Sequence, residues 1–273
     1  MNRKNLTAAV LAGLAGVAGI AGTAQAVNIN PDGTGQVLLY PYYTTNGGNQ
    51  TLISVVNTTE NAKAVKVRFM EGYNSREVLD FNLYLSPFDV WTAGLADSAF
   101  FTDGAVVGIP HLKTMDTSCT VPYLYLEAST APGLQAFLDL AYTGTAADGG
   151  PTGIARAAEG HFEMIEMGTL VDEGSFTPAT WVDHGTTGVP ANCLKLVEAW
   201  TEYRTNTNAV DRDKSGLWVL EGIDNGDDKA TTSTDRNSGG LFGSAAIVNP
   251  ENGTMYSYDA KAIQGFDSSD DGM

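Results

Sequence analysis

The clearest pattern along the chain is an alternation of apolar and basic positions over residues 64–69. Val65, Val67 and Phe69 alternate with Lys66 and Arg68, so one face of an extended segment is apolar and the other is basic. A period of two is typical of a β-strand with one face in the core. We therefore predict a strand here, with the apolar side chains pointing inward.

Other short extended segments surround this one and are separated by Gly, Asn and Pro. Residues 37–43 are apolar at both parities, which is typical of a strand buried on both faces. Further strands are predicted at 52–57, 78–85 and 88–92. Strands spaced by about 8 to 14 residues favour an antiparallel sandwich over an α/β domain. The predicted fold is mainly β, an Ig-like antiparallel β-sandwich with an inserted α+β segment.

The later part of the chain has a different character. Helical spacing links four residues after Pro132 and Gly133, and four more after Pro190. They are Leu134, Phe137, Leu138 and Tyr142, then Cys193, Leu194, Val197 and Trp200. Residues 161–167 alternate as a strand, 217–223 form another, and 245–248 with 255–258 form a hairpin.

These patterns divide the chain into five ranges. The sandwich begins in 27–96 and is completed by strands in 211–262, and 97–210 is predicted as an inserted or capping segment. An acidic tail over 263–273 is expected to be disordered. The first range, 1–26, has the composition of a targeting segment.

Residues 1–26 have the features of a cleavable signal peptide. Arg3 and Lys4 precede an uncharged apolar run over 6–21, and Ala24 and Ala26 place small residues where a signal peptidase cuts. A retained membrane helix is disfavoured because the run is rich in Ala and Gly and shorter than the roughly 20 apolar residues of a span. We expect an exported protein that begins near Val27, with no membrane span in the mature chain.

The chain is strongly acidic, with 15 basic and 32 acidic residues and a formal net charge of −17. Loss of 1–26 removes two basic residues and no acidic one, so the mature charge becomes −19. Such a charge argues against nucleic acid or an anionic membrane as a partner and agrees with cation binding or with simple solubility.

Two cysteines, Cys119 and Cys193, lie in the mature part of the chain. An even count in an oxidising compartment favours a disulfide, and the pair lacks the CxxC spacing of a metal site. We predict that they pair, which would close a long loop and stabilise the fold by about 4 kcal/mol in the chain-entropy model.

One acidic loop resembles the first half of a calcium-binding loop. Asp211, Asp213 and Ser215 supply oxygen atoms at alternate positions before a glycine, a spacing that lets the chain wrap a hard cation. The twelfth position is Gly222 instead of glutamate, so a looser Ca²⁺ site that includes Asp224 is the alternative. A solvated acidic hairpin with Asx turns explains the same residues without a metal.

No catalytic constellation is evident. His111, His161 and His184 have neither HExxH nor helical zinc spacing, and no G-x-S-x-G or Ser-x-x-Lys motif occurs. Glu163 and Glu166 are three apart on a predicted strand, so they face opposite sides and do not form one glycosidase pair.

Aromatic residues are the remaining candidates for ligand contact. Three tyrosines and four tryptophans are involved, and buried rings would fill the core whereas exposed rings would stack on sugars. They are Tyr40, Tyr42, Tyr43, Trp91, Trp181, Trp200 and Trp218. Trp91 and Trp218 are predicted to be core residues.

Three segments carry a resemblance to a known group of proteins. Residues 35–44, 54–58 and 160–168, with the sequences GQVLLYPYYT, SVVNT and GHFEMIEMG, resemble uncharacterised secreted or cell-surface proteins of Gram-negative bacteria. The resemblance implies passage through the periplasm to the cell surface or medium. It brings no assigned activity or catalytic residue, and its longer members imply that this chain is truncated.

The sequence therefore predicts a non-enzymatic secreted or surface protein with a structural or adhesive role. Its partners would be other proteins or further copies of itself, and residues 27–43 could add as a strand to a neighbour. Two alternatives stay open: a calcium-stabilised carbohydrate-binding module that takes glycans, and a hydrolase with an unrecognised site.

Overall fold

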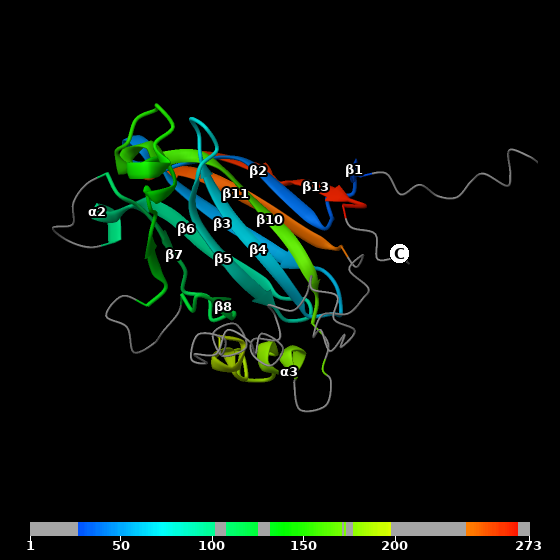
Figure 1. The fold of residues 1–273 in the computed structure, drawn as a ribbon. Helices are drawn as coiled ribbons and strands as arrows, with labels where there is room; N and C mark the ends of the chain where they lie inside the picture. The colour runs from blue at the N-terminus through cyan, green and yellow to red at the C-terminus, as the bar shows by residue number, and fades with distance from the viewer. Residues whose placement is uncertain are drawn as a thin grey trace, which may run out of the picture.

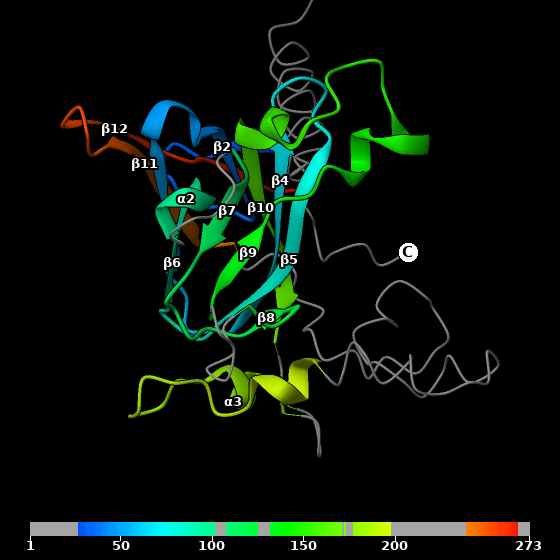
Figure 2. The ribbon, with the colours of Figure 1, turned by 90° about the vertical axis from the view of Figure 1, so that its left-hand side faces the viewer.

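The strands of the protein form two antiparallel sheets that pack face to face (Figures 1 and 2). The computed structural model describes residues 27–101, 108–124, 132–170, 172, 177–197 and 239–266. The predicted mainly β fold, a β-sandwich, is confirmed. Within these residues, no helix has the length and apolar character needed to cross a membrane.

Within the described ranges, the first sheet has seven strands. In spatial order they are β1 (Asn28–Ile29), β13 (Lys261–Gln264), β2 (Val37–Thr44), β10 (Glu159–Thr169), β4 (Lys63–Glu71), β5 (Glu77–Leu85) and β8 (Thr120–Val121). All of its neighbouring pairs are antiparallel. Ile263 and Gln264 belong to β13, so the prediction of a disordered tail is wrong for these two residues.

The second sheet has six strands in the part of the chain that the structure describes. In spatial order they are β12 (Thr254–Asp259), β11 (Leu241–Asn249), β3 (Gln50–Asn57), β6 (Val90–Asp97), β7 (Pro110–Lys113) and β9 (Leu134–Ala136). The chain passes from β12 to β13 through the single residue Ala260, so the two sheets are joined along one side of the sandwich.

Helical structure in the described residues is confined to short turns. They are η1 (Asn46–Gly48), α2 (Ser98–Phe101), η2 (Leu140–Tyr142), η3 (Gly144–Ala146), η4 (Ile154–Ala158) and α3 (Pro178–Val182), with a further turn over 193–197. The helix predicted from Leu134 to Tyr142 is wrong. Leu134 pairs with Lys113 as part of β9, and Phe137 is buried in the core, so pairing with β7 overrides the helical spacing.

The alternation over 64–69 is confirmed as one face of β4. Val65, Val67 and Phe69 are fully buried between the sheets. On the outer face, Lys66 pairs with Asp80, and Arg68 pairs with both Glu77 of β5 and Glu163 of β10. The outer face is thus a ladder of opposite charges across three adjacent strands.

Strand β10 lies in the centre of the seven-stranded sheet, between β2 and β4. It comes from the range 97–210 that the sequence assigned to an inserted or capping segment. Strands β7 and β9 of the same range belong to the six-stranded sheet. The described part of 97–210 therefore contributes strands to both sheets of the sandwich, in addition to supplying turns at its two ends.

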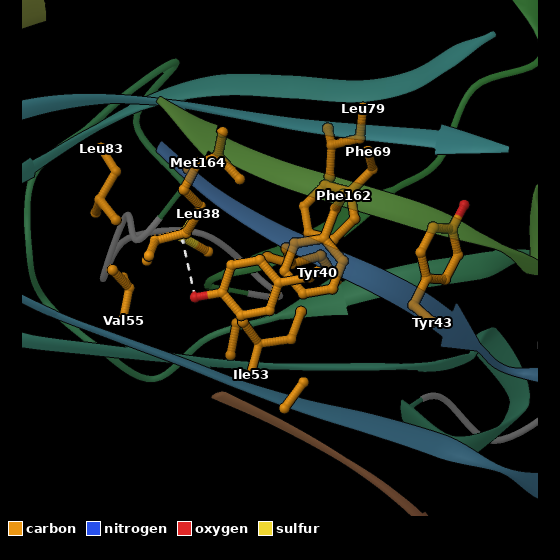
Figure 3. Packing of buried hydrophobic residues seen from close by; sticks show 14 of the residues in the cluster. Leu38, Tyr40, Tyr43, Ile53, Val55, Phe69, Leu79, Leu83, Phe162 and Met164 are labelled. Atoms are coloured by element: carbon orange, nitrogen blue, oxygen red, sulfur yellow. Dashed lines mark hydrogen bonds between the residues drawn. The ribbon is translucent and has the colours of Figure 1, made fainter. Parts of the chain in front are cut away.

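The core is built around stacked aromatic rings (Figure 3). Phe162 of β10 stacks on Tyr40 of β2 with ring centroids 4.1 Å apart, and on Phe69 of β4 at 4.9 Å. The Tyr40 hydroxyl crosses the sandwich and donates to the Ser54 carbonyl of β3 at 2.9 Å. Gly243 of β11 leaves space for this hydroxyl, which a Cβ there would meet at 1.8 Å.

A second, smaller apolar cluster lies outside the sandwich. The segment that carries α3 covers one end of the outer face of the seven-stranded sheet, where Ala64 and Tyr84 meet Val182 and Leu196. The predicted disulfide between Cys119 and Cys193 is confirmed and lies in this cluster. It attaches the segment, hereafter the cap (residues 177–197), to the chain beside β8.

Replacement of Phe162 by Ala should lower the free energy of unfolding by about 3–5 kcal/mol, because the change removes a fully buried ring that stacks on rings of two neighbouring strands. Urea unfolding followed by tyrosine and tryptophan fluorescence measures it. The matched control is Phe88→Ala, which removes a ring that is 66% exposed and should change stability by less than about 0.5 kcal/mol. Equal effects of the two changes would contradict the assignment of Phe162 to the core.

Loss of the disulfide in Cys119→Ser/Cys193→Ser should destabilise the protein by about 2–4 kcal/mol. Amide hydrogen exchange should become faster first in the cap, because without the disulfide the cap is held to the sheet mainly by the small apolar cluster. The amides of β4 and β10 should stay protected. Equal loss of protection in the cap and in β4 would show that the cap is not a separate unit.

Candidate functional site

The free edges of the two sheets differ in length. Among the described residues, the seven-stranded sheet ends in β1 and β8, with two residues each, and the six-stranded sheet ends in β9 with three residues and β12 with six. Very short edge strands offer little backbone for another chain to pair with. Strand β12 is therefore the edge that can accept a further strand.

The pairing of β12 with β11 is regular along its whole length, from Asn249↔Thr254 to Ser244↔Asp259. This confirms the predicted hairpin. The Ala260 N–H donates to the Gly243 carbonyl at 2.9 Å, and inward and outward backbone groups alternate along an antiparallel strand. The N–H and C=O groups of Met255, Ser257 and Asp259 consequently point away from β11.

Figure 2 shows the β11–β12 hairpin projecting at one side of the sandwich. Every residue of β12 except Tyr258 is exposed, and Tyr258 packs against the core. Met255 is 71% exposed and Tyr256 is 66% exposed. The rings of Tyr256 and Tyr258 are 6.2 Å apart, and the Tyr258 hydroxyl donates to the carbonyl of Tyr42. Burial raises the pKa of Tyr258 to about 12, so this hydroxyl stays protonated and remains a donor at neutral pH.

Strand β12 lacks the features that usually protect an edge. Its sequence, TMYSYD, contains no Pro and no Lys, and its register with β11 has no bulge. The single charge is Asp259 at the end of the strand. A regular, exposed edge without these features is typical of a surface that pairs with another strand.

A cluster of Ser86, Asp89 and His184 has the residue types of a hydrolase triad. The Ser86 hydroxyl lies 2.9 Å from Nδ1 of His184, and an Asp89 oxygen lies 3.6 Å from the same nitrogen. In a triad the serine and the carboxylate contact opposite ring nitrogens, so that the ring can accept the serine proton while the carboxylate orients it. Here both contact one nitrogen, and the cluster instead joins the cap to the turn between β5 and β6.

The other histidines and carboxylates considered for catalysis are dispersed. Nδ1 of His111 lies 3.0 Å from the Ile109 carbonyl, and His161 lies on β10. No group of three or more His, Cys, Asp or Glu side chains is placed to hold a metal within the described ranges. Glu163 pairs with Arg68 and Glu166 with Lys63, so these two carboxylates do not share a site.

The acidic loop considered for calcium lies outside the described residues. This applies to Asp211, Asp213, Ser215 and Asp224, to Trp200 and Trp218, and to the strand predicted over 217–223. The signal peptide over 1–26 also lies outside the described residues.

The other aromatic candidates are divided between the core and the surface. Tyr40, Tyr43 and Trp91 are buried in the core, so the prediction for Trp91 is confirmed. Trp181 is partly buried in the cap, against the small apolar cluster. Tyr42 is exposed beside β12.

A buried ionic network closes the turn between β4 and β5. Arg156 of η4 donates to both carboxylate oxygens of Glu71, at 2.8 and 2.9 Å, and also binds Asp148. Glu71 further accepts the backbone N–H groups of Tyr73, Asn74 and Arg76. Within the described chain, Glu71 and Arg156 are nearly inaccessible to solvent. The network therefore holds the loop structure, and both carboxylate oxygens of Glu71 are occupied.

Comparison of the chain with protein families, with curated proteins and with solved structures finds no match. A functional proposal therefore rests on the geometry of the described residues.

Stability should depend on the charge of Glu71. Burial alone raises the pKa of Glu71, but the hydrogen bonds from Arg156 and from three backbone N–H groups lower it from 4.5 to about 2. A lowered folded-state pKa means that the stabilisation is complete above the unfolded value and is lost as pH falls toward 2. Urea unfolding at several pH values between 2 and 5 should show this loss.

The matched variant is Glu71→Gln, which keeps the shape and removes the charge. It should be less stable than the natural chain at pH 7, and the difference should shrink below pH 4.5. A difference that stays constant from pH 7 to pH 2 would contradict the role of the carboxylate.

Proposed function

We propose that the protein is a non-enzymatic structural or adhesive protein of the cell exterior that self-associates by β-strand addition through β12. The observation that carries the proposal is the six-residue edge of β12, with outward backbone groups at Met255, Ser257 and Asp259 and a regular register without a bulge. Edge strands pair with chains that supply matching donors and acceptors, and a second copy supplies the same set in antiparallel orientation.

In one register of two antiparallel copies of β12, the backbone groups can pair and the facing side chains are also compatible. If Ser257 pairs with Ser257 of the other copy, Tyr256 of one chain faces Tyr258 of the other, and Asp259 faces Met255. Aromatic pairs across antiparallel strands are favourable, and no carboxylate faces another carboxylate in this register. The arrangement is symmetric and closes as a dimer that joins two six-stranded sheets into one.

The strand that the sequence favoured for addition occupies another place in the fold. Residues 37–44 form β2, which pairs with β10 on one side and β13 on the other. Of the N-terminal stretch over 27–43, the two residues Asn28 and Ile29 form the edge strand β1. For this reason we assign strand addition to β12.

The test is a pair of substitutions at Ser257. Ser257→Pro removes the outward N–H but leaves the inward bonds to β11 intact, and proline is tolerated on edge strands in this orientation. Each dimer would lose two hydrogen bonds, so dissociation should become easier by roughly tenfold or more. Ser257→Thr keeps the N–H and serves as the control. Sedimentation equilibrium on the chain from Val27 measures both.

Salt provides a second readout of the same association. The strongly negative net charge makes two copies repel each other, and this repulsion is screened at higher ionic strength. Dimerisation should therefore strengthen between about 0.02 and 0.3 M NaCl. A chain that stays monomeric at millimolar concentration in high salt would refute assembly through β12. Equal dimerisation of the Ser257→Pro and Ser257→Thr variants would refute it as well.

Export is tested separately from assembly. Expression of residues 1–273 in a Gram-negative host should give a processed protein outside the cytoplasm that starts at Val27, because Ala24 and Ala26 satisfy signal peptidase. Fractionation and mass spectrometry of the N-terminal peptide provide the measurement. An unprocessed chain in the cytoplasm would contradict a role at the cell exterior.

A further inference from the structure

Helix α2 and the loop between β2 and β3 lie at the end of the sandwich away from the cap (Figures 1 and 2). Residues of these two segments line a cavity of about 540 Å³. Its walls come from η1, from the end of β6 with α2, and from η4. The volume is within the range of small-ligand sites, about 300–1,000 Å³. This cavity shares no residue with β12, so it goes beyond the assembly proposed above.

Three amide side chains, Asn46, Asn49 and Gln50, line one wall. Asn49 donates to the Asn46 carbonyl at 2.7 Å and accepts from Asn249 at 3.1 Å, so its orientation is set by the loop. The side-chain amides of Asn46 and Gln50 form no hydrogen bond with any other residue that the structure describes. Amides offer donors and acceptors together, which is the requirement for binding hydroxyl groups.

An aromatic ring stands at the rim of the cavity. Phe100 of α2 is 61% exposed, and its ring is braced edge-to-face against Phe101 at 5.3 Å. Asp97 fixes α2 by accepting the Ala99 N–H at 2.9 Å with one oxygen and the Gly108 N–H at 2.5 Å with the other. An exposed ring held in place beside amides can stack on the C–H face of a ring-shaped ligand while the amides bind its hydroxyl groups.

The charge of the cavity limits the class of ligand. Among the described residues that line it there is no Lys, Arg or His, and the one ionisable side chain is Asp97. An anionic ligand such as a phosphate or an acidic sugar would meet this carboxylate and the overall negative charge without a compensating base. A cation would find a single carboxylate whose two oxygens already accept N–H groups. The lining is mostly apolar apart from the amides, so it fits a neutral ligand that has an apolar face and several hydroxyl groups.

We propose that this cavity binds a neutral saccharide, with Phe100 as the stacking platform and Asn46 and Gln50 as the hydroxyl-binding groups. Saccharide binding here would provide the adhesive contact of the protein independently of its assembly through β12.

The test uses an array of immobilised neutral, sialylated and sulfated oligosaccharides, probed with the chain from Val27. Binding to neutral glycans is expected, and calorimetric titration with the best-bound free oligosaccharide should give at least tenfold weaker affinity for Phe100→Ala and for Asn46→Ala. Phe88→Ala, which removes a similarly exposed ring elsewhere on the sandwich, should bind like the natural chain.

Three results of the glycan experiments would overturn the proposal: no neutral glycan bound, acidic glycans preferred, or unchanged affinity in Phe100→Ala. Enhanced fluorescence of an apolar naphthalene dye that is lost in Phe100→Ala, without glycan binding, would assign the cavity to an apolar ligand and also overturn it. The Ser257→Pro chain serves as a further arm, because it should keep glycan binding while losing dimerisation, so failure of one proposal is distinguishable from failure of the other.

Discussion

The stacking of Phe162 between Tyr40 and Phe69 is the interaction on which the rest of the sandwich depends. These rings come from β10, β2 and β4, and β10 is the strand that joins the other two in one sheet. Without β10, the seven-stranded sheet would separate into two parts. The outer charge ladder also depends on it, because Arg68 pairs with Glu163 of β10 as well as with Glu77 of β5. Strand β10 therefore contributes both to the aromatic packing of the core and to the charge pairs on the outer face.

Local patterns in the sequence were sufficient for the strands but insufficient for their order. The alternation of Val65, Val67 and Phe69 with basic residues correctly indicated which face of β4 is buried, because burial on one face imposes a period of two. Residues 161–167 were correctly predicted as extended. Their position between β2 and β4 could not be predicted, because it depends on pairing between segments about a hundred residues apart, and periodicity contains no information on partners.

For the candidate site, too, local features could be predicted from the sequence, whereas features that depend on strand order could not. The disulfide could be predicted because the chain contains two cysteines and no others to compete with them. The β11–β12 hairpin was visible as two apolar runs around a turn, but its exposed edge was not, because an edge exists only once the strand order is known. The buried Glu71–Arg156 pair was also missed, since 85 residues separate the two and neither has a distinctive neighbour. The Leu134–Tyr142 prediction failed because four spaced apolar residues fit a β-strand followed by turns as well as a helix.

The pairing of β1 with β13 has a mechanical consequence. Asn28 faces Gln264, so the first and last described strands meet at one edge of the sandwich, and the chain enters β1 and leaves β13 at the same end of the pair. A pulling force applied at these two residues would load the hydrogen bonds of β1–β13 one after another instead of all at once. This geometry unzips at low force, whereas the β2–β10–β4 centre carries little of the load until the edge has opened. When force is applied through Asn28 and Gln264, the edge strands should therefore detach and lengthen the molecule before the central strands carry the force.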